Sequence, residues 1–456
     1  MLFTKTTPVT VRTKGDLPPS GPLPRALQTA GCRWFAYQYF QAAHRRFGNR
    51  FSVHPIDMPP LVFLSDPEDV RAVLTADPAV LHPGAGSAIL APLIGARSLM
   101  LLEEDEHLVS RRVVSPAFHQ RIVAEHTAML LDVAEREIAE WPTDSPAALH
   151  PRIRSLTLRV ILRAIFGEPD CLDRLHEALM RSLEISTSFV LQEPTLRCLP
   201  GWRQAWQAFL REQAKVDDIL YSLMRRRETE RPAQPTGLLD MLLAGHQVDG
   251  SPMTHHEVRD NLMSLILAGH ETTTGELAWA FQLLAHHQPV QDRLIEELDA
   301  SHGENDYLTA TVNETMRRKP VFLFCIPREV VEPVEIGGWT YRPPAHLAGC
   351  TYLMHHHPDL YPRPYEFRPE RFIDETPQPR AWLPWGGGKK HCLGRHFALL
   401  EFKTVMRLVL TSYRVLPDRP AIEAPRWRSA ILVPRDGGRV VLRHRRTLNS
   451  RPLLHA

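Results

Sequence analysis

A single cysteine near the C-terminal end follows a run of glycines and precedes a helical pattern. The stretch reads Trp385-Gly-Gly-Gly-Lys-Lys-His-Cys392-Leu-Gly394, and a helix is predicted from Arg395 onward. Consecutive glycines allow a tight turn and a close approach to a flat or bulky group. A cysteine at a helix N-terminus is favoured as a thiolate, because free N–H groups and the helix dipole stabilise negative charge. Such a thiolate is a strongly donating ligand for iron.

A second candidate site lies inside a long apolar helix, predicted from a capping box at Thr254 and Glu257 to about His287. Its centre reads Ala-Gly-His-Glu-Thr-Thr-Thr over residues 268–274. Glycine and threonine are poor helix formers, and a buried carboxylate is unfavourable unless it is hydrogen-bonded. A polar kink in a core helix would explain this patch. The alternative is a functional one, since a carboxylate and a hydroxyl can order water for proton transfer.

Two charged pairs complete the candidate chemistry. His107 and Arg111 are four residues apart, and Glu314 and Arg317 are three apart, so each pair shares one helix face. Taken alone, the first pair could be a solvated basic face and the second a surface salt bridge. A further charged stretch, Phe-Arg-Pro-Glu-Arg-Phe, follows at residues 367–372.

These motifs, in this order, resemble those of the cytochrome P450 family along nearly the whole chain. The resemblance implies a mainly α fold with a smaller β-rich part. Haem would lie between the long oxygen-groove helix and the cysteine-ligand loop. It also implies one domain over residues 1–456, in which about 1–16 and 444–456 are expected to be flexible tails. The expected cofactor is haem b, with O2 as co-substrate.

The resemblance gives roles to five residues. Cys392 is the expected axial ligand of the haem iron. Ala268 and Gly269 would leave room for dioxygen, while Glu271 and Thr272 would relay protons to it. Further residues are expected to hold the haem through its propionates, its edge or the loop beside it: His107, Arg111, Arg328, His355, Trp385, Gly388 and Lys390.

Two of these residues depart from the family pattern, because Trp385 replaces the usual Phe and Lys390 the usual Arg or His. Lysine keeps the charge but loses the bidentate fork of arginine. Glu314, held between Arg317 and Arg371, is expected to position the cysteine loop rather than to react. A metal site at the adjacent histidines 355–357 is disfavoured, because consecutive side chains diverge.

The substrate is predicted only as a class. The pocket candidates are apolar, which suggests a lipophilic terpenoid, polyketide or fatty acyl compound, oxidised in secondary metabolism by hydroxylation, epoxidation or further oxidation. The alternatives are a peroxide-driven or non-redox enzyme of the same fold, or a non-enzymatic haem sensor or carrier. The pocket candidates are Ile89, Leu90, Leu93, Phe189, Leu262, Leu265, Ile266, Val321, Leu323 and Ile431.

Composition sets the remaining expectations. The chain has 456 residues, is 43% hydrophobic and carries a formal net charge of +2, which gives no argument for nucleic acid. Six cysteines show no paired spacing, and no N-terminal anchor or signal segment is evident, so a monomer in a reducing cytoplasm is expected. No flavin or iron–sulfur domain fits the chain. Electrons from NAD(P)H should therefore arrive through a ferredoxin or flavodoxin and its reductase, docking at Arg112, Lys389, Lys390 and Arg395.

Local patterns predict several boundaries. Strands are expected at about 50–53, 61–64 and 347–353, and Asp66 is expected to cap a helix. Residues 77–97, rich in proline and glycine, are expected to form a long irregular loop. Residues 182–201 are less regular than the helices around them and resemble the mobile lid helices of the family.

Overall fold

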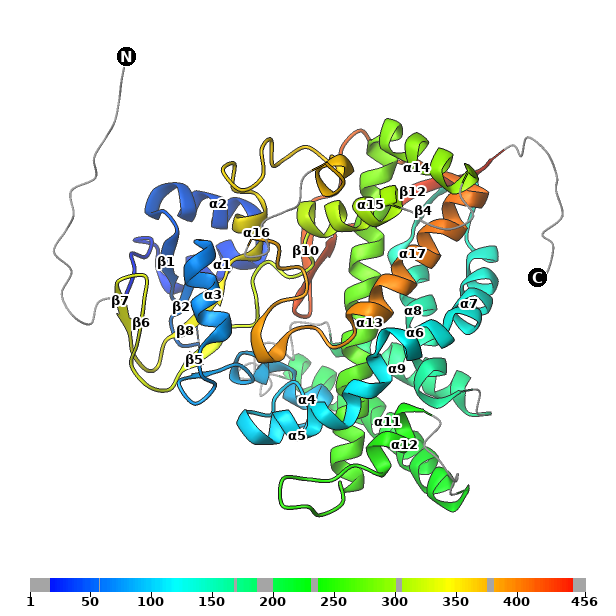
Figure 1. The fold of residues 1–456 in the computed structure, drawn as a ribbon, viewed down its shortest axis with the longest axis horizontal. Coiled ribbons are helices and arrows are strands. Elements are labelled where there is room, and N and C mark those ends of the chain that lie inside the picture. Colours follow the sequence, from blue (N-terminus) through cyan, green and yellow to red (C-terminus); the bar gives the residue numbers. More distant parts are fainter. Residues whose placement is uncertain are drawn as a thin grey trace.

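The computed structural model describes residues 17–56, 58–167, 170–186, 200–230, 237–300, 306–374 and 381–445. Helices make up most of this part, and a smaller β-rich part gathers beside the N-terminal helices (Figure 1). The predicted fold class is therefore confirmed. The N-terminal helices are α1 (Arg25–Trp34), α2 (Ala36–Phe47), α3 (Pro67–Thr75), α4 (Ala91–Ile94), α5 (Glu104–Val114), α6 (Gln120–Glu125), α7 (Thr127–Ala139), α8 (His150–Phe166) and α9 (Leu172–Ser186).

The C-terminal helices surround one long central element. Thr254 and Glu257 form the predicted capping box, which satisfies free backbone N–H groups where the long helix begins. This helix passes through the middle of the molecule, and α8, α17 and the β10–β11 hairpin pack around it (Figure 1). The helices are α11 (Pro200–Glu230), α12 (Leu238–Leu243), α13 (His255–His286, the central one), α14 (Gln288–Ala300), α15 (Asp306–Arg318), α16 (Thr351–His355) and α17 (Arg395–Ser412).

The main sheet has the strand order β1-β2-β8-β5-β3, in which β2 and β8 are parallel and the other neighbours antiparallel. A second sheet has the order β4-β12-β9, and β6–β7 and β10–β11 are separate hairpins. The strands are β1 (Arg50–Val53), β2 (Leu61–Leu64), β3 (Leu81–His82), β4 (Pro146–Ala148), β5 (Arg328–Val330), β6 (Val334–Ile336), β7 (Trp339–Tyr341), β8 (His346–Gly349), β9 (Tyr413–Pro417), β10 (Pro425–Arg428), β11 (Ile431–Pro434) and β12 (Arg439–His444).

Three boundary predictions need correction. Residues 77–97 are not irregular throughout, because they contain β3, a 3-10 helix at Ala85–Leu90 and α4. The strand predicted to reach residue 353 ends at Gly349, where its partner β2 ends, and the backbone then turns into α16. The flexible C-terminal tail does not begin at residue 444: His444 pairs with Tyr413, and the guanidinium of Arg445 donates to the carbonyl of Leu410. Residues 1–16 and 446–456 lie outside the described residues.

The other local predictions hold. Strands β1 and β2 span the predicted residues, and the carboxylate of Asp66 accepts hydrogen bonds from the backbone N–H groups of Glu68 and Asp69 at the start of α3. Helix α2 follows α1 directly along the chain, with only Phe35 between them. In the part of the chain that the structure describes, no helix is long and apolar enough to cross a membrane.

Candidate active site

The loop before α17 is shaped by its glycines. The backbone N–H of Cys392 donates to the carbonyl of Trp385 at 2.9 Å, which closes the loop on itself. Gly386 and Gly388 have positive φ angles of 66° and 68°, a region that favours glycine. A Cβ at Gly388 would also lie 1.8 Å from the carbonyl oxygen of Leu74 on α3. The glycines therefore let the loop press against the backbone of α3.

Cys392 lies three residues before Arg395, the first residue of α17, and the residue as a whole is exposed although its sulfur is surrounded by protein. Withdrawal of its sulfur from bulk water raises the pKa of Cys392, while the backbone N–H of Gly394 and the charges of Arg111 and Arg395 lower it. The expected preference for a thiolate at the helix N-terminus is therefore outweighed by burial in the protein alone. A bound metal cation would supply the missing positive charge and deprotonate the thiol.

The central helix α13 has one face that protein does not cover. Ala268 is exposed, and Gly269 and Thr272 are half-buried, although residues 257–267 and 273–285 are buried. The hydroxyl of Thr272 donates to the carbonyl of Ala268 at 2.7 Å. A Cβ at Gly269 would meet the side chain of Ile161 on α8 at 3.2 Å. Gly269 thus allows the close packing of α8 against α13. Its expected role of leaving room for dioxygen stays a prediction.

Glu271 points to another side of α13 than Thr272, as neighbours in a helix must. Its side chain is buried between two arginines: Oε1 accepts a hydrogen bond from Nε of Arg154 at 3.3 Å, and Oε2 lies 3.4 Å from Nε of Arg428. Among the described residues, no direct hydrogen bond joins Glu271 to Thr272. A proton relay between them would therefore need water.

Four basic side chains gather near the cysteine loop. The pKa of His107 is lowered to about 3 by burial and by the charges of Lys390 and Arg111. Burial lowers the pKa of Lys390 to about 8, and its ammonium donates to the backbone carbonyls of Met100 and Leu102.

The same group contains two arginines. Arg111 donates to the carbonyl of His391 at 3.0 Å, which ties α5 to the cysteine loop. Arg328 is 7% exposed, and its Nε has no hydrogen-bond partner in the described part of the chain. An unpaired buried guanidinium nitrogen beside other cations calls for an anion. The two propionates of haem match this demand, so the residues present fit the group.

The structure brings Glu314, Arg317 and Arg371 together, as the sequence predicted. Arg317 binds both carboxylate oxygens of Glu314 at 2.7 and 2.8 Å, and Nε of Arg371 lies 3.1 Å from one of them. All three are buried, and Arg317 also donates to the backbone carbonyls of His355 and Pro364. The cluster ties α15 to the segment that leads to the cysteine loop. Its role in positioning that loop stays a prediction.

The adjacent histidines 355–357 diverge. The ring of His355 lies against Trp382, and its Nε2 accepts from the backbone N–H of Leu383. The ring of His356 lies against Tyr352 and Tyr365. Among the described residues, no group of three His, Cys, Asp or Glu side chains could hold a metal ion. The contact of His355 with the haem edge stays a prediction.

The described pocket candidates fall in three packing clusters, apart from the exposed Ile89, and their lining of one pocket stays a prediction. Val321 and Ile431 pack together against Trp279, whereas Leu323 packs in a different cluster beside β1 and β2. Ile89 is 43% exposed, and Phe189 lies outside the described residues. The remaining candidates belong to the large helical core: Leu90, Leu93, Leu262, Leu265 and Ile266.

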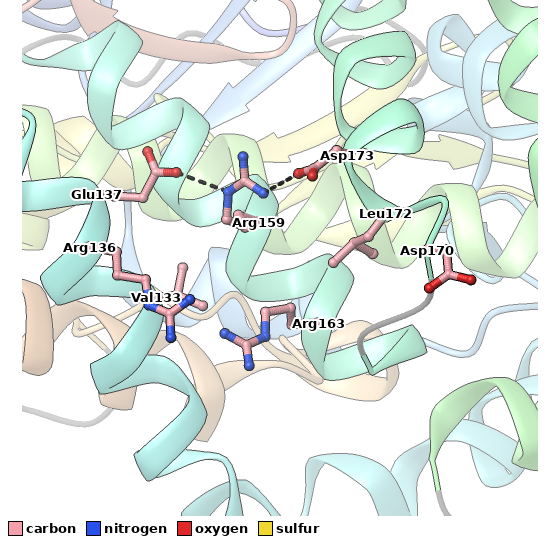
Figure 2. A pocket seen from close by; sticks show the side chains of 8 residues that line it. All are labelled: Val133, Arg136, Glu137, Arg159, Arg163, Asp170, Leu172 and Asp173. Carbon is pink, nitrogen blue, oxygen red and sulfur yellow. Dashed lines mark hydrogen bonds and ion pairs between the residues drawn. The ribbon is translucent and has the colours of Figure 1, made fainter.

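A surface hollow between α7, α8 and the start of α9 is a different kind of site (Figure 2). Six of its eight lining side chains are charged, and the other two are Val133 and Leu172. Arg159 forms ion pairs with Glu137 and Asp173 (Figure 2). Arg163 pairs with Asp132. The two arginines Arg159 and Arg163 are therefore already paired with carboxylates.

Sequence reasoning missed the partners of Glu271. Arg154 and Arg428 are 117 and 157 positions away along the chain, so no local spacing connects them. Arg154 did carry a signal, because it lies four residues before Leu158 on the buried face of α8. Sequence reasoning also missed Glu401 of α17, a buried carboxyl that is hydrogen-bonded to Thr273. Burial raises the pKa of Glu401 well above its ordinary value.

Comparisons with known proteins agree with this geometry. The sequence model described as Cytochrome P450 matches residues 18–441. The putative cytochrome P450 135B1 of Mycobacterium tuberculosis is 32% identical over 443 residues, covering 95% of this chain and 93% of the relative. The putative cytochrome P450 135A1 of the same species is 33% identical over 444 residues, covering 95% and 96%. A solved structure described as retinoic acid bound cyanobacterial CYP120A1 superposes with a TM-score of 0.81 at 22% identity, covering 94% of this chain and 99% of that one.

The chain belongs to the cytochrome P450 family. It is accordingly a haem-dependent monooxygenase that uses haem b and O2 and takes electrons from NAD(P)H through redox partners.

Proposed function

We propose that this cytochrome P450 oxidises a lipophilic small molecule of terpenoid, polyketide or fatty acyl type, by hydroxylation, epoxidation or further oxidation in secondary metabolism. The observation that carries the site is the placement of Cys392 in an exposed glycine loop, in a chain whose central helix leaves Ala268 and Thr272 uncovered. The substrate class is supported by apolar side chains one to two turns earlier on the same helix, at Leu262, Leu265 and Ile266.

The residues then divide the work as follows. Cys392 would hold the haem iron, and Arg328, with His107, Arg111 and Lys390, would hold the propionates. The bound haem supplies the activation of dioxygen. The hydroxyl of Thr272 and the carboxylate of Glu271 would pass protons from solvent toward the uncovered face of α13, through water between them.

Electrons would arrive from an acidic ferredoxin or flavodoxin that docks beside the cysteine loop, in the cytoplasm. Arg112, Lys389 and Arg395 are exposed there and can attract an acidic partner. Lys390 was expected on the same surface, but its ammonium turns inward to the carbonyls of Met100 and Leu102. The proposed docking face therefore consists of Arg112, Lys389 and Arg395.

The first test is the absorption spectrum of the reduced, carbon-monoxide-bound protein beside a Cys392→Ser variant. A strongly red-shifted Soret band in the wild type alone would support thiolate ligation by Cys392. Cys171 is half-buried and directly precedes α9. The matched control variant Cys171→Ser should therefore keep the red-shifted band. A wild-type band at the ordinary position, or a shifted band that survives Cys392→Ser, would contradict the assignment.

A further inference from the structure

Four charged side chains from four elements meet beside the oxygen-groove motif. Arg154 lies on α8, Glu184 near the end of α9, Glu271 in the middle of α13 and Arg428 at the end of β10. Each arginine forms an ion pair with both carboxylates, so the four side chains form a ring in which positive and negative charges alternate. The proton-relay role of Glu271 in the proposed function therefore depends on a network that reaches another helix.

The distances in this network are unequal. Oε2 of Glu184 lies 2.7 Å from Nη1 of Arg154 and 2.6 Å from Nη2 of Arg428. The nearest approaches of the same arginines to Glu271 are 3.3 and 3.4 Å. Charge-assisted hydrogen bonds of normal strength are about 2.7–2.9 Å long. Both guanidiniums are thus held mainly by Glu184 and only loosely by Glu271.

The difference between the arginine distances to Glu184 and to Glu271 matters because Glu271 is buried. The side chains of Arg154, Arg428 and Glu271 are only 6–8% exposed, whereas that of Glu184 is 62% exposed. Oε2 of Glu271 has no hydrogen bond among the described residues, although the carboxylate is buried. A buried acceptor left free in this way is available to water or to a proton. Two full guanidinium bonds would remove that availability.

The neighbouring groups do not change the charge balance. His270 lies 3.9 Å from Glu271, but burial lowers the pKa of its imidazole well below the usual value, so it stays neutral. His150, which also feels the charge of Glu271, has its pKa lowered to about 3 by burial. Two positive and two negative charges remain. Removing the charge of Glu184 would therefore leave both arginines to Glu271 alone.

We propose that Glu184 is a positioning residue for Glu271. By holding Arg154 and Arg428, Glu184 prevents the two guanidiniums from closing on the carboxylate of Glu271, and so keeps that carboxylate free to accept and release protons. The inference rests on the proposed function of Glu271. It adds that proton delivery at α13 is controlled from α9.

The test is a Glu184→Gln variant, which keeps the shape of the side chain and removes its charge. Product formed per NAD(P)H consumed should fall by roughly tenfold, and the ratio of turnover rates in H2O and D2O should rise, because proton transfer becomes limiting. The rate of haem reduction and the dissociation constant of the substrate should stay within twofold of the wild type. A crystal structure of the variant should show both guanidiniums within hydrogen-bond distance of Glu271.

Two further variants separate positioning from mere stability. Glu177→Gln removes a carboxylate of similar exposure, 66%, on the same helix, and should leave coupling unchanged, because within the described residues Glu177 forms its ion pair with the exposed Arg181. The double variant Glu184→Gln/Arg428→Gln restores the balance of charge around Glu271 and should recover at least half of the lost coupling. A purely structural role predicts the opposite, since two losses of contact would add.

The outcomes are distinct. Unchanged coupling in Glu184→Gln, or a double variant worse than the single one, would overturn the positioning role while leaving the monooxygenase intact. A wild type that binds carbon monoxide without the red-shifted band, or that forms no product with any electron donor, would instead contradict the proposed function. The crystal structure of the variant decides the movement of the arginines in either case.

Discussion

Thr272 and Thr274 lie two residues apart on α13 and therefore face different surroundings. The hydroxyls of Thr272 and Thr274 each donate to the carbonyl four residues earlier, at 2.7 and 2.8 Å. Thr274 also bonds the hydroxyl of Thr157 on α8 and is fully buried, whereas Thr272 faces the uncovered side of the helix. Only Thr272 is placed to exchange its backbone bond for a water or a bound molecule.

This difference gives a prediction for a matched pair of variants. Thr272→Val keeps the volume and removes the hydroxyl, so product per NAD(P)H should fall by roughly tenfold or more with little change in stability. Thr274→Val should instead lower the thermal midpoint by leaving the hydroxyl of Thr157 without this partner, while coupling is kept. Product yield and thermal unfolding of both variants provide the measurements. Equal coupling in the two would remove Thr272 from the proton path.

At the scale of elements, the sequence predicted the helix starts that depend on capping residues nearby in the chain. The capping box at Thr254 fixed the start of α13 and the side chain of Asp66 fixed the start of α3, because caps depend on neighbours within three residues. The pairing of Glu314 with Arg371 also followed from motifs. The network around Glu271 could not be predicted in this way, because it joins α8, α9, α13 and β10 through tertiary packing. The end of β8 at Gly349 depended on where β2 stops, which a single strand pattern does not contain.

The glycine loop offers a second test with a matched control. Gly388 and Gly250 both have positive φ, 68° and 83°, but only at Gly388 would a Cβ meet another atom within 4 Å. Gly250→Ala should therefore destabilise the protein by about 1–2 kcal/mol through backbone strain alone. Gly388→Ala should lose roughly 1–3 kcal/mol more, since the loop must move off α3, and should reduce haem content.

Denaturant unfolding measures the free-energy difference, and the ratio of Soret to protein absorbance measures haem content. The two variants should separate in both quantities. If Gly388→Ala retains full haem content and unfolds like Gly250→Ala, the contact of the loop with Leu74 does not shape the site.

On the scale of the whole molecule, the net charge is small, but exposed basic side chains lie near the cysteine loop. The formal net charge is only +2, yet Arg112, Lys389 and Arg395 are exposed on α5, in the cysteine loop and at the start of α17. A nearly neutral protein with a local basic face can select an acidic partner without binding polyanions in general. The proposed docking face includes Lys389, which belongs to the cysteine loop itself.

Reversing two of these charges should slow electron transfer. Lys389→Glu/Arg112→Glu is chosen because Arg395 also acts on the thiol of Cys392. The rate of reduction by an acidic ferredoxin should fall about tenfold at low ionic strength and approach the wild-type rate at high salt, while substrate affinity stays unchanged. Stopped-flow reduction over a range of salt concentrations measures this. The reversal Arg211→Glu/Arg225→Glu on α11 is the control, and an equal effect there would contradict a specific docking face.

The contact between Gly388 and the Leu74 carbonyl has a consequence for how the protein is made. The two residues are 314 positions apart, the difference between 388 and 74. At bacterial elongation rates of about 5–20 residues per second, α3 leaves the ribosome roughly 15–60 s before the loop that completes it. The loop with Cys392, the proposed iron ligand, is thus synthesised well after α3, and the proposed haem site is incomplete until then. Throughout that interval the nascent chain must be kept from aggregating without its cofactor.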